Sequence, residues 1–127
     1  MAQANPLLGT WRVESFERWS ADGTPTQPLG APPAGYAVFD ENGLAFIQLG
    51  RRTTTDLPAK EIAQSLMAYF GPYSVNAAGD EVTVTVEASN MAAYVGSTQV
   101  RRFSRDGDAL TLGVEGQYRA RLRRVTR

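Results

Sequence analysis

The segment QVRRF carries the side chains whose chemistry is easiest to specify from the sequence. Successive residues of a strand point to opposite faces, so Gln99, Arg101 and Phe103 share one face and Val100 and Arg102 take the other. Whichever face is buried carries an arginine, and a buried guanidinium without an anionic or strongly accepting partner costs several kcal/mol. The segment therefore predicts either an internal ion pair or a binding site for an anionic or carbonyl-bearing group.

Two residue types that dominate catalytic and metal sites are absent. The 127 residues include no His and no Cys, which excludes disulfides, thiolate nucleophiles, His-dependent dyads and triads, His-ligated haem and ordinary structural zinc sites. We expect no metal and no cofactor, because Gly-x-Gly phosphate loops are also absent. The 13 basic and 13 acidic residues balance, which argues against nucleic acid or a membrane as partner. Without a leader-like or spanning apolar run, the expected location is cytoplasmic.

Turn-forming residue pairs divide the chain into alternating strands. Pairs typical of two-residue hairpin loops are Asn42-Gly43, Gly79-Asp80, Asp106-Gly107 and Glu115-Gly116. The predicted strands span residues 7 to 19, 35 to 40, 44 to 50, 72 to 77, 81 to 89, 98 to 105, 109 to 114 and 117 to 125. We expect these eight strands to form a single domain over residues 1 to 127.

One segment, TDLPAKEIAQSLMAYFGPY, has helical periodicity. Ile62, Leu66 and Tyr69 lie along one stripe and predict a short helix. Its boundaries are marked by Thr55 or Asp56 as N-cap, Pro58 in the first turn, and Gly71 with Pro72 at the end.

An antiparallel meander removes its exposed edges by closing, so we expect an all-β, eight-stranded up-and-down barrel. Its long connections, residues 20 to 34, 51 to 70 and 90 to 97, then fall at one end, with the helix nearby. The tight turns fall at the other end and pinch it shut. A barrel of this size is either filled by side chains or holds one small ligand.

Gly9-Thr10-Trp11 resembles the G-x-W signature of lipocalin-type barrels. The wider pattern of LLGTWRVESFE, PLGAPPAGYAVFDENGLAFIQL, YFGPYSV and VGSTQVRRFSRDGDALTL resembles the small bacterial lipocalin-like domain family, whose barrels are of the calycin type. The resemblance implies that Trp11 plugs the closed end, that Arg124 packs across it, and that the Phe103 face points inward. The segment VTVTVEAS lacks the His pairs of some relatives, so no metal or haem role is carried over.

Strict alternation from Trp11 places Glu17 on the inner face, near the mouth, where it could reach Arg101. Two hypotheses follow. Either Glu17 and Arg101 form a structural pair that fixes the register, or a carboxylate, phenolate or enolate of a ligand replaces or joins Glu17.

Tyrosines supply the remaining candidates for a ligand site. Tyr36, Tyr73 and Tyr118 are placed in the mouth halves of their strands, where an aromatic ring with a polar tip suits a mostly apolar cavity. Tyr69 on the helix and Tyr94 on the loop could form an adaptable lid together with Met67, Phe70 and Met91. For all of these residues, ordinary packing is the alternative.

Two classes of function remain open. The first is binding of a small apolar or amphipathic molecule whose polar end is fixed by Arg101 and Gln99. The second is a cofactor-independent cyclase or isomerase acting on a natural-product intermediate, with Arg101, Glu17 and Tyr73 as the catalytic candidates.

Two features of the strand faces are also left open. The sequence does not decide whether Phe46 and Gln48, or the residues that alternate with them, face inward on strand 44 to 50. Phe16 and Val100, both placed on outward faces, could seed a homodimer interface.

Overall fold

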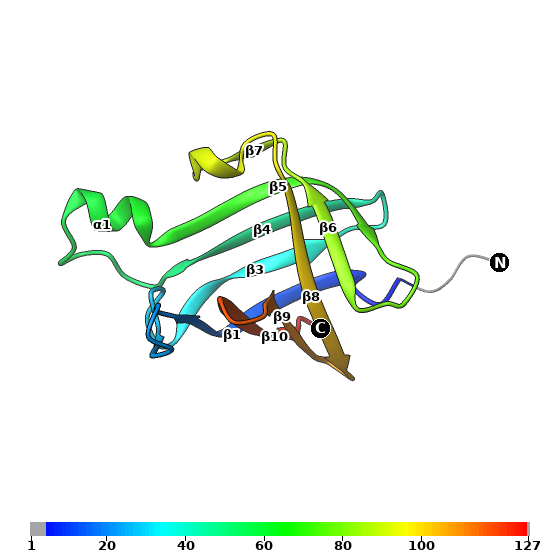
Figure 1. The fold of residues 1–127 in the computed structure, drawn as a ribbon, viewed down its shortest axis with the longest axis horizontal. Helices are drawn as coiled ribbons and strands as arrows, with labels where there is room; N and C mark the ends of the chain where they lie inside the picture. The colour runs from blue at the N-terminus through cyan, green and yellow to red at the C-terminus, as the bar shows by residue number, and fades with distance from the viewer. Residues whose placement is uncertain (1–4, 127) are drawn as a thin grey trace.

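A ring of antiparallel strands forms the fold (Figure 1), and this computed structural model describes residues 5–126. The elements are β1 (Gly9–Trp19), β2 (Pro25–Thr26), β3 (Pro33–Phe39), β4 (Leu44–Arg51), α1 (Ala59–Gln64), β5 (Leu66–Val75), β6 (Glu81–Thr85), β7 (Ala88–Ser89), the 3-10 turn η1 (Ala92–Tyr94), β8 (Thr98–Asp106), β9 (Ala109–Val114) and β10 (Tyr118–Arg124). The eight strands β1, β3, β4, β5, β6, β8, β9 and β10 pair in sequence, and β10 returns to pair with β1. The predicted eight-stranded barrel is confirmed.

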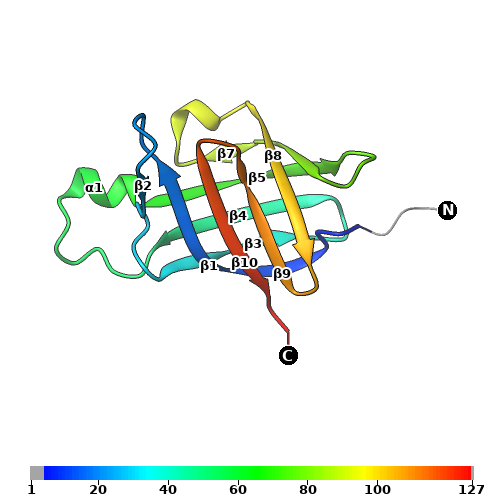
Figure 2. The same ribbon diagram turned by 60° about the horizontal axis from the view of Figure 1, so that its bottom comes forward.

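The barrel is flattened into two layers that cross at a steep angle. Figure 2 shows β1, β10, β9 and β8 side by side in front of β3, β4 and β5. The short strands β2 and β7 are not part of the ring; β2 pairs with the end of β1, and β7 pairs with β5. As predicted, the long connections with β2, α1 and η1 gather at one end, the mouth, while the β3–β4, β5–β6 and β8–β9 turns close the other.

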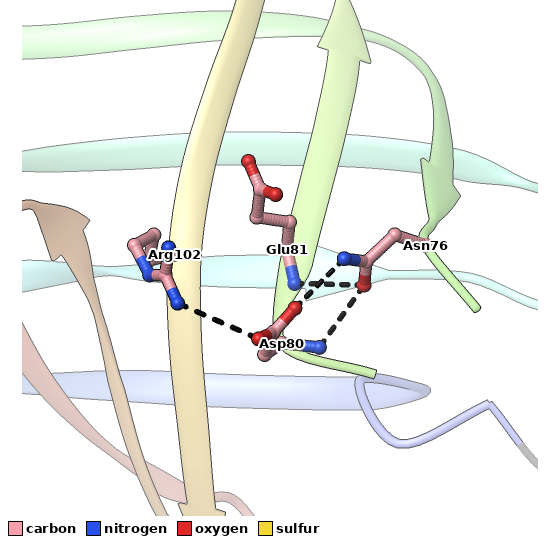
Figure 3. A network of polar contacts seen from close by, with 4 residues as sticks. All are labelled: Asn76, Asp80, Glu81 and Arg102. Carbon is pink, nitrogen blue, oxygen red and sulfur yellow. Dashed lines mark hydrogen bonds and ion pairs between the residues drawn. The ribbon is translucent and has the colours of Figure 1, made fainter. Parts of the chain in front are cut away.

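The turn between β5 and β6 shows how side chains hold the closed end (Figure 3). The Oδ1 atom of Asn76 accepts hydrogen bonds from the backbone N–H groups of Asp80 and Glu81, both at 3.0 Å. Arg102 on β8 extends to the same turn, with its Nη2 atom 3.5 Å from the Asp80 carboxylate. Both partners are largely exposed, so this ion pair contributes little stability. Of the two adjacent arginines, Arg102 is thus the one that faces outward.

The prediction of a helix that continues through Tyr69 is wrong. The helix α1 ends at Gln64, no side chain caps its N-terminus, and β5 begins at Leu66. The same residues also fit strand alternation, because Met67 and Tyr69 are buried while Leu66 and Phe70 face outward. Pairing of Leu66 to Pro72 with β4 shows that this segment is a strand. Within residues 5–126, neither helix has the length and apolar character needed to cross a bilayer.

The predicted strand 81 to 89 is interrupted. β6 ends at Thr85, and the register against β5 then shifts by one residue, from Tyr73 opposite Val84 to Tyr69 opposite Ser89. An extra residue of this kind is a β-bulge, which bends the strand locally. The bend carries the chain into η1, over the mouth.

A second irregularity lies in β1 and changes which side chains face inward in the part of this strand nearest the mouth. The register against β10 shifts between Val13 and Ser15, so that alternation restarts with Phe16 on the inside. Phe16 is 1% exposed, whereas Glu17 faces outward. The prediction that Glu17 points into the barrel is therefore wrong, as is the placement of Phe16 on an outer surface that could seed a dimer.

The closed end is plugged by Trp11, which is fully buried. Its indole Nε1 donates to the carbonyl oxygen of Leu7 at 2.9 Å. The Arg124 guanidinium lies 4.4 Å from the Trp11 ring centroid, donates to Leu8 O at 2.8 Å, and contacts Asp108 at 3.6 Å. The contact between Trp11 and Arg124 that the resemblance implied is thus present.

The inner face of β4 consists of Ala45, Ile47 and Leu49, which resolves the face that the sequence left open. Phe46 points outward and stacks on Phe70 of β5, with ring centroids 6.3 Å apart.

Candidate functional site

The mouth contains two cavities. The first, which we call the arginine cavity, has a volume of about 570 Å³ and is bordered by Arg101, Gln99, Tyr94 and Tyr118. The second, which we call the large cavity, has a volume of about 910 Å³ and lies beneath α1 and η1. Arg18 borders both. Volumes of this size suit a drug-sized ligand.

Arg101 lies on the inner face of β8. Strand alternation buries Arg101 and Phe103, each 6% exposed, and leaves Val100 outside at 45%. The guanidinium donates from Nη2 to Gln99 Oε1 at 2.7 Å and to Tyr94 Oη at 3.2 Å, and from Nη1 to the carbonyl oxygen of Val100 at 3.0 Å. All three acceptors are uncharged groups.

No carboxylate forms an ion pair with Arg101 in the part of the chain that the structure describes. The ion pairs found there involve Arg102, Arg119, Arg123 and Arg124 but not Arg101. Moreover, the Nε–H of Arg101 is buried and has no hydrogen-bond partner among the described residues. A buried donor of this kind is costly unless something occupies the space beside it.

Aromatic rings surround the guanidinium. Its Cζ atom lies 5.2 Å from the ring centroid of Tyr118 and 5.9 Å from that of Tyr94, distances at which cation–π attraction acts. Tyr118 stacks on Phe16 at 5.3 Å, and Tyr69 meets Tyr94 edge-on at 5.5 Å. This aromatic enclosure gives the cation a polarisable environment that still leaves its charge unneutralised.

The phenols near Arg101 remain protonated over the physiological range. Burial raises the pKa of Tyr69 and of Tyr118 above the ordinary value of 10.0, against the opposing influence of the Arg101 charge. These hydroxyls are therefore hydrogen-bond donors at neutral pH and not bases.

Gln99 completes the polar wall of the arginine cavity. Its amide nitrogen donates to Ser97 Oγ at 2.7 Å, which fixes the amide so that its oxygen faces Arg101. Arg101, Gln99, Tyr118, Tyr69 and Tyr94 are thus brought together as a cluster, although Tyr69 reaches it from β5 and not from a helix.

Three other candidates lie elsewhere. Glu17 pairs with Arg119 on the outer surface, with an oxygen-to-nitrogen distance of 3.2 Å. Tyr36 is 41% exposed on the outer face of β3, where Arg12 lies over its ring. Tyr73 is at the closed end, where its hydroxyl donates to Asp40 O at 3.0 Å, because β5 begins earlier than predicted and so places residue 73 far from the mouth.

The sequence interpretation missed most of the large cavity. Phe16 and Leu29 line it together with Met67 and Met91, the two methionines assigned to a lid from the sequence. Phe16 was missed because a β-bulge has no reliable sequence marker. Leu29 could have been noticed as an isolated apolar residue within the Pro-rich connection, and it is 3% exposed.

Comparison with known proteins agrees with this architecture. Residues 8–123 match a family model described as a lipocalin-like domain. No curated protein matches the sequence. Among solved structures, the chain is similar to the crystal structure of an uncharacterized protein from Bacteroides eggerthii, with a TM-score of 0.52 and 16% sequence identity over 94% of this chain and 99% of the other. At that identity, the likeness concerns the fold alone.

Proposed function

Since this chain belongs to the lipocalin-like domain family, we propose that its barrel binds a small amphipathic molecule whose anionic or carbonyl end is received by Arg101 and Gln99. The family and the barrel support binding of a small molecule in general terms. The residues at the mouth support the finer assignment of which end of the ligand goes where.

One observation carries this proposal: among residues 5–126, the buried Arg101 has only uncharged acceptors, and its Nε–H has no hydrogen-bond partner. Removing a cation from water costs several kcal/mol, and a structural arginine normally recovers that cost through a carboxylate partner. A ligand carboxylate would supply the missing charge in the fork geometry that guanidinium favours, and an enolate would supply it through a single oxygen. The free protein therefore already holds a positive charge and a hydrogen-bond donor positioned to bind an anion.

The large cavity accommodates the apolar part of such a ligand. Phe16, Leu29, Met67 and Met91 form the apolar part of its lining, and the thioethers can adapt to irregular shapes. The Phe16–Tyr118 stack connects this lining with the aromatic enclosure of Arg101. A molecule with one polar end and a hydrophobic body matches the two cavities together.

A second candidate function is that of a cofactor-independent cyclase or isomerase in the same cavities. The cluster favours it in one respect: Arg101 and the protonated hydroxyl of Tyr118 could stabilise negative charge that develops on a carbonyl oxygen. The described residues in contact with Arg101 include no base, however, and Glu17 and Tyr73, the other catalytic candidates, lie outside the mouth. We therefore place binding first.

Ligand-induced stabilisation tests the proposed function. Native mass spectrometry of freshly purified protein would first reveal any ligand that copurifies. Thermal shifts with hydrophobic carboxylates and phenols would then be compared among the wild type, Arg101→Ala and the control Arg102→Ala, whose side chain is exposed on the same strand. A ligand at a hundred times its Kd stabilises by about 2.7 kcal/mol.

We expect this stabilisation in the wild type and in Arg102→Ala, and its loss in Arg101→Ala. Equal shifts in all three proteins, or no binder in a broad library, would refute the assignment of Arg101 as the anchor of the ligand.

A further inference from the structure

Tyr94 contacts Arg101 in the way that a ligand would. Its ring stands edge-on to Tyr69, its hydroxyl oxygen accepts from Arg101 Nη2, and its face lies near the guanidinium. Yet Tyr94 comes from the connection over the mouth and not from a strand of the ring. An aromatic group carrying an oxygen acceptor is thus already bound to the proposed anchor.

The backbone of the segment that carries Tyr94 is attached to the barrel at the two ends of the segment. On one side, the side-chain amide of Asn90 bonds to the backbone of β5 at 2.7 and 2.9 Å. On the other, Ser97 and Gly96 exchange backbone hydrogen bonds with Val86 at 2.9 and 3.1 Å. Among the described residues, the backbone hydrogen bonds of residues 92 to 95 are all made within this segment. A hinge motion between the two attachments would break no strand pairing.

Tyr94 also stands at the division between the two cavities. Its ring borders the arginine cavity, while the preceding Met91, Ala92 and Ala93 border the large cavity. Outward rotation of η1 would withdraw the Tyr94 hydroxyl and ring from the guanidinium. The contacts that Tyr94 vacates would then be available to a ligand.

We propose that the ligand carries an aromatic ring and a carboxylate, and that it binds by displacing Tyr94, which occupies its place in the free protein. This inference rests on the proposed function and specifies its ligand. The edge of Tyr69 and the cation–π position select an aromatic ring. The carboxylate is selected because it can accept two hydrogen bonds from the guanidinium, whereas the Tyr94 hydroxyl accepts one.

Displacement has a measurable consequence for affinity. When the binding-competent state is only a fraction of the population, the apparent Kd equals the intrinsic Kd divided by that fraction. Removing the Tyr94 side chain makes the site competent at all times, so a ligand of the proposed class should bind more tightly to the variant than to the wild type. A residue that merely lined the pocket would show the opposite change.

The test uses isothermal titration of the full chain with 4-phenylbutyrate, its neutral amide, and the cyclohexyl analogue of the acid. We expect Tyr94→Ala to bind 4-phenylbutyrate about tenfold more tightly than the wild type, and Tyr94→Phe, which keeps the ring but loses the hydroxyl, about threefold more tightly. The amide and the cyclohexyl acid should each bind at least about fivefold more weakly than the aromatic acid. Val95→Ala, at an exposed position of the same segment, is the matched control and should leave affinity unchanged.

Thermal melting confirms that each variant is folded, and Tyr94→Phe serves if Tyr94→Ala does not fold. Unchanged or weaker binding of 4-phenylbutyrate in the folded Tyr94 variants would overturn the proposed displacement of Tyr94. Equal binding of the cyclohexyl acid and the aromatic acid would overturn the proposed requirement for an aromatic ring. If binding of the acid still depends on Arg101 in these experiments, the proposed function stands while this inference fails. Binding that is equal in the wild type and in Arg101→Ala would overturn the proposed function itself.

Discussion

Replacing Arg101 with methionine separates a ligand-binding arginine from a structural one. Methionine retains a long unbranched stem that fills most of the same space, but it carries no charge. If Arg101 is kept for binding, the free protein bears the cost of holding an unneutralised cation in its interior. The variant should then be more stable than the wild type when no ligand is present, as is common where function opposes stability.

The expected magnitude follows from the contacts of Arg101. The substitution gives up three hydrogen bonds to uncharged acceptors and the attraction of two aromatic rings. Gln99 and Tyr94 border a cavity and can form hydrogen bonds with water there, so the loss of Arg101 as a partner costs little free energy. Replacing buried ionic groups by apolar ones of similar size stabilises by up to roughly 4 kcal/mol. After the lost contacts, we expect a gain of roughly 1 to 2 kcal/mol in the free energy of unfolding.

Differential scanning calorimetry would measure this gain. With an unfolding entropy of about 2.1 cal/mol/K per residue, the gain corresponds to a rise in Tm of roughly 4 to 8 °C for a chain of this length. The matched control is Arg124→Met, which makes the same substitution at an arginine that packs on Trp11 and pairs with Asp108. We expect that variant to lose roughly 1 to 3 kcal/mol, because its contacts plug the barrel.

A lower Tm in Arg101→Met, comparable to the loss in Arg124→Met, would refute the reasoning. It would show that the barrel needs the buried guanidinium for its own stability, and the basis for an anion site would disappear.

Three further predictions concern the irregular strands and the buried phenols. Phe16→Ala should lower the free energy of unfolding by roughly 3 to 5 kcal/mol and Glu17→Gln by less than about 1 kcal/mol, measured by urea denaturation; the reverse order would contradict the bulge in β1. Gly71→Ala should cost about 3 kcal/mol in the same assay, because a Cβ atom there would lie 1.8 Å from a carbonyl oxygen of β6, and an unchanged midpoint would refute that close approach. Stability should fall as the pH rises above 10, because the unfolded chain then releases the protons of Tyr69 and Tyr118 while the folded chain retains them; ultraviolet titration that shows all five tyrosines ionising near pH 10 in the folded protein would contradict this.

The architecture was predictable because turn chemistry and alternation agree along most of the chain. Gly43, Gly79, Gly107 and Gly116 all adopt the positive φ angles that tight turns require, which a residue with a side chain adopts less readily. Once the turns are located, the two ends of the barrel follow from counting strands. Alternation places Arg101 on the same face as Phe103, and the resemblance to lipocalin-like barrels indicated that this face points inward, where the structure buries both residues.

The site was predictable only where the strands are regular. Because of the bulge in β1, Phe16 and not Glu17 lies on the inner face, and no local preference of these residues predicts the bulge. β5 was assigned to a helix because Leu66 and Tyr69 satisfy a helical spacing as well as a strand pattern, and the pairing with β4 that decides between them is a long-range interaction. Each of these errors moved a candidate residue to the wrong face or the wrong end.

The two ends of the barrel chain meet at the closed end, where Trp11 lies opposite Arg124 and Val125 N donates to Thr10 O at 2.8 Å. A tag or a surface linker attached at either terminus therefore points the mouth away from its support. A short peptide joining the termini would give a circular permutant, and new ends could be opened in the connection between β1 and β3. Such a permutant would tether a reporter group beside the mouth, and so provide a sensor for binding of the proposed ligands.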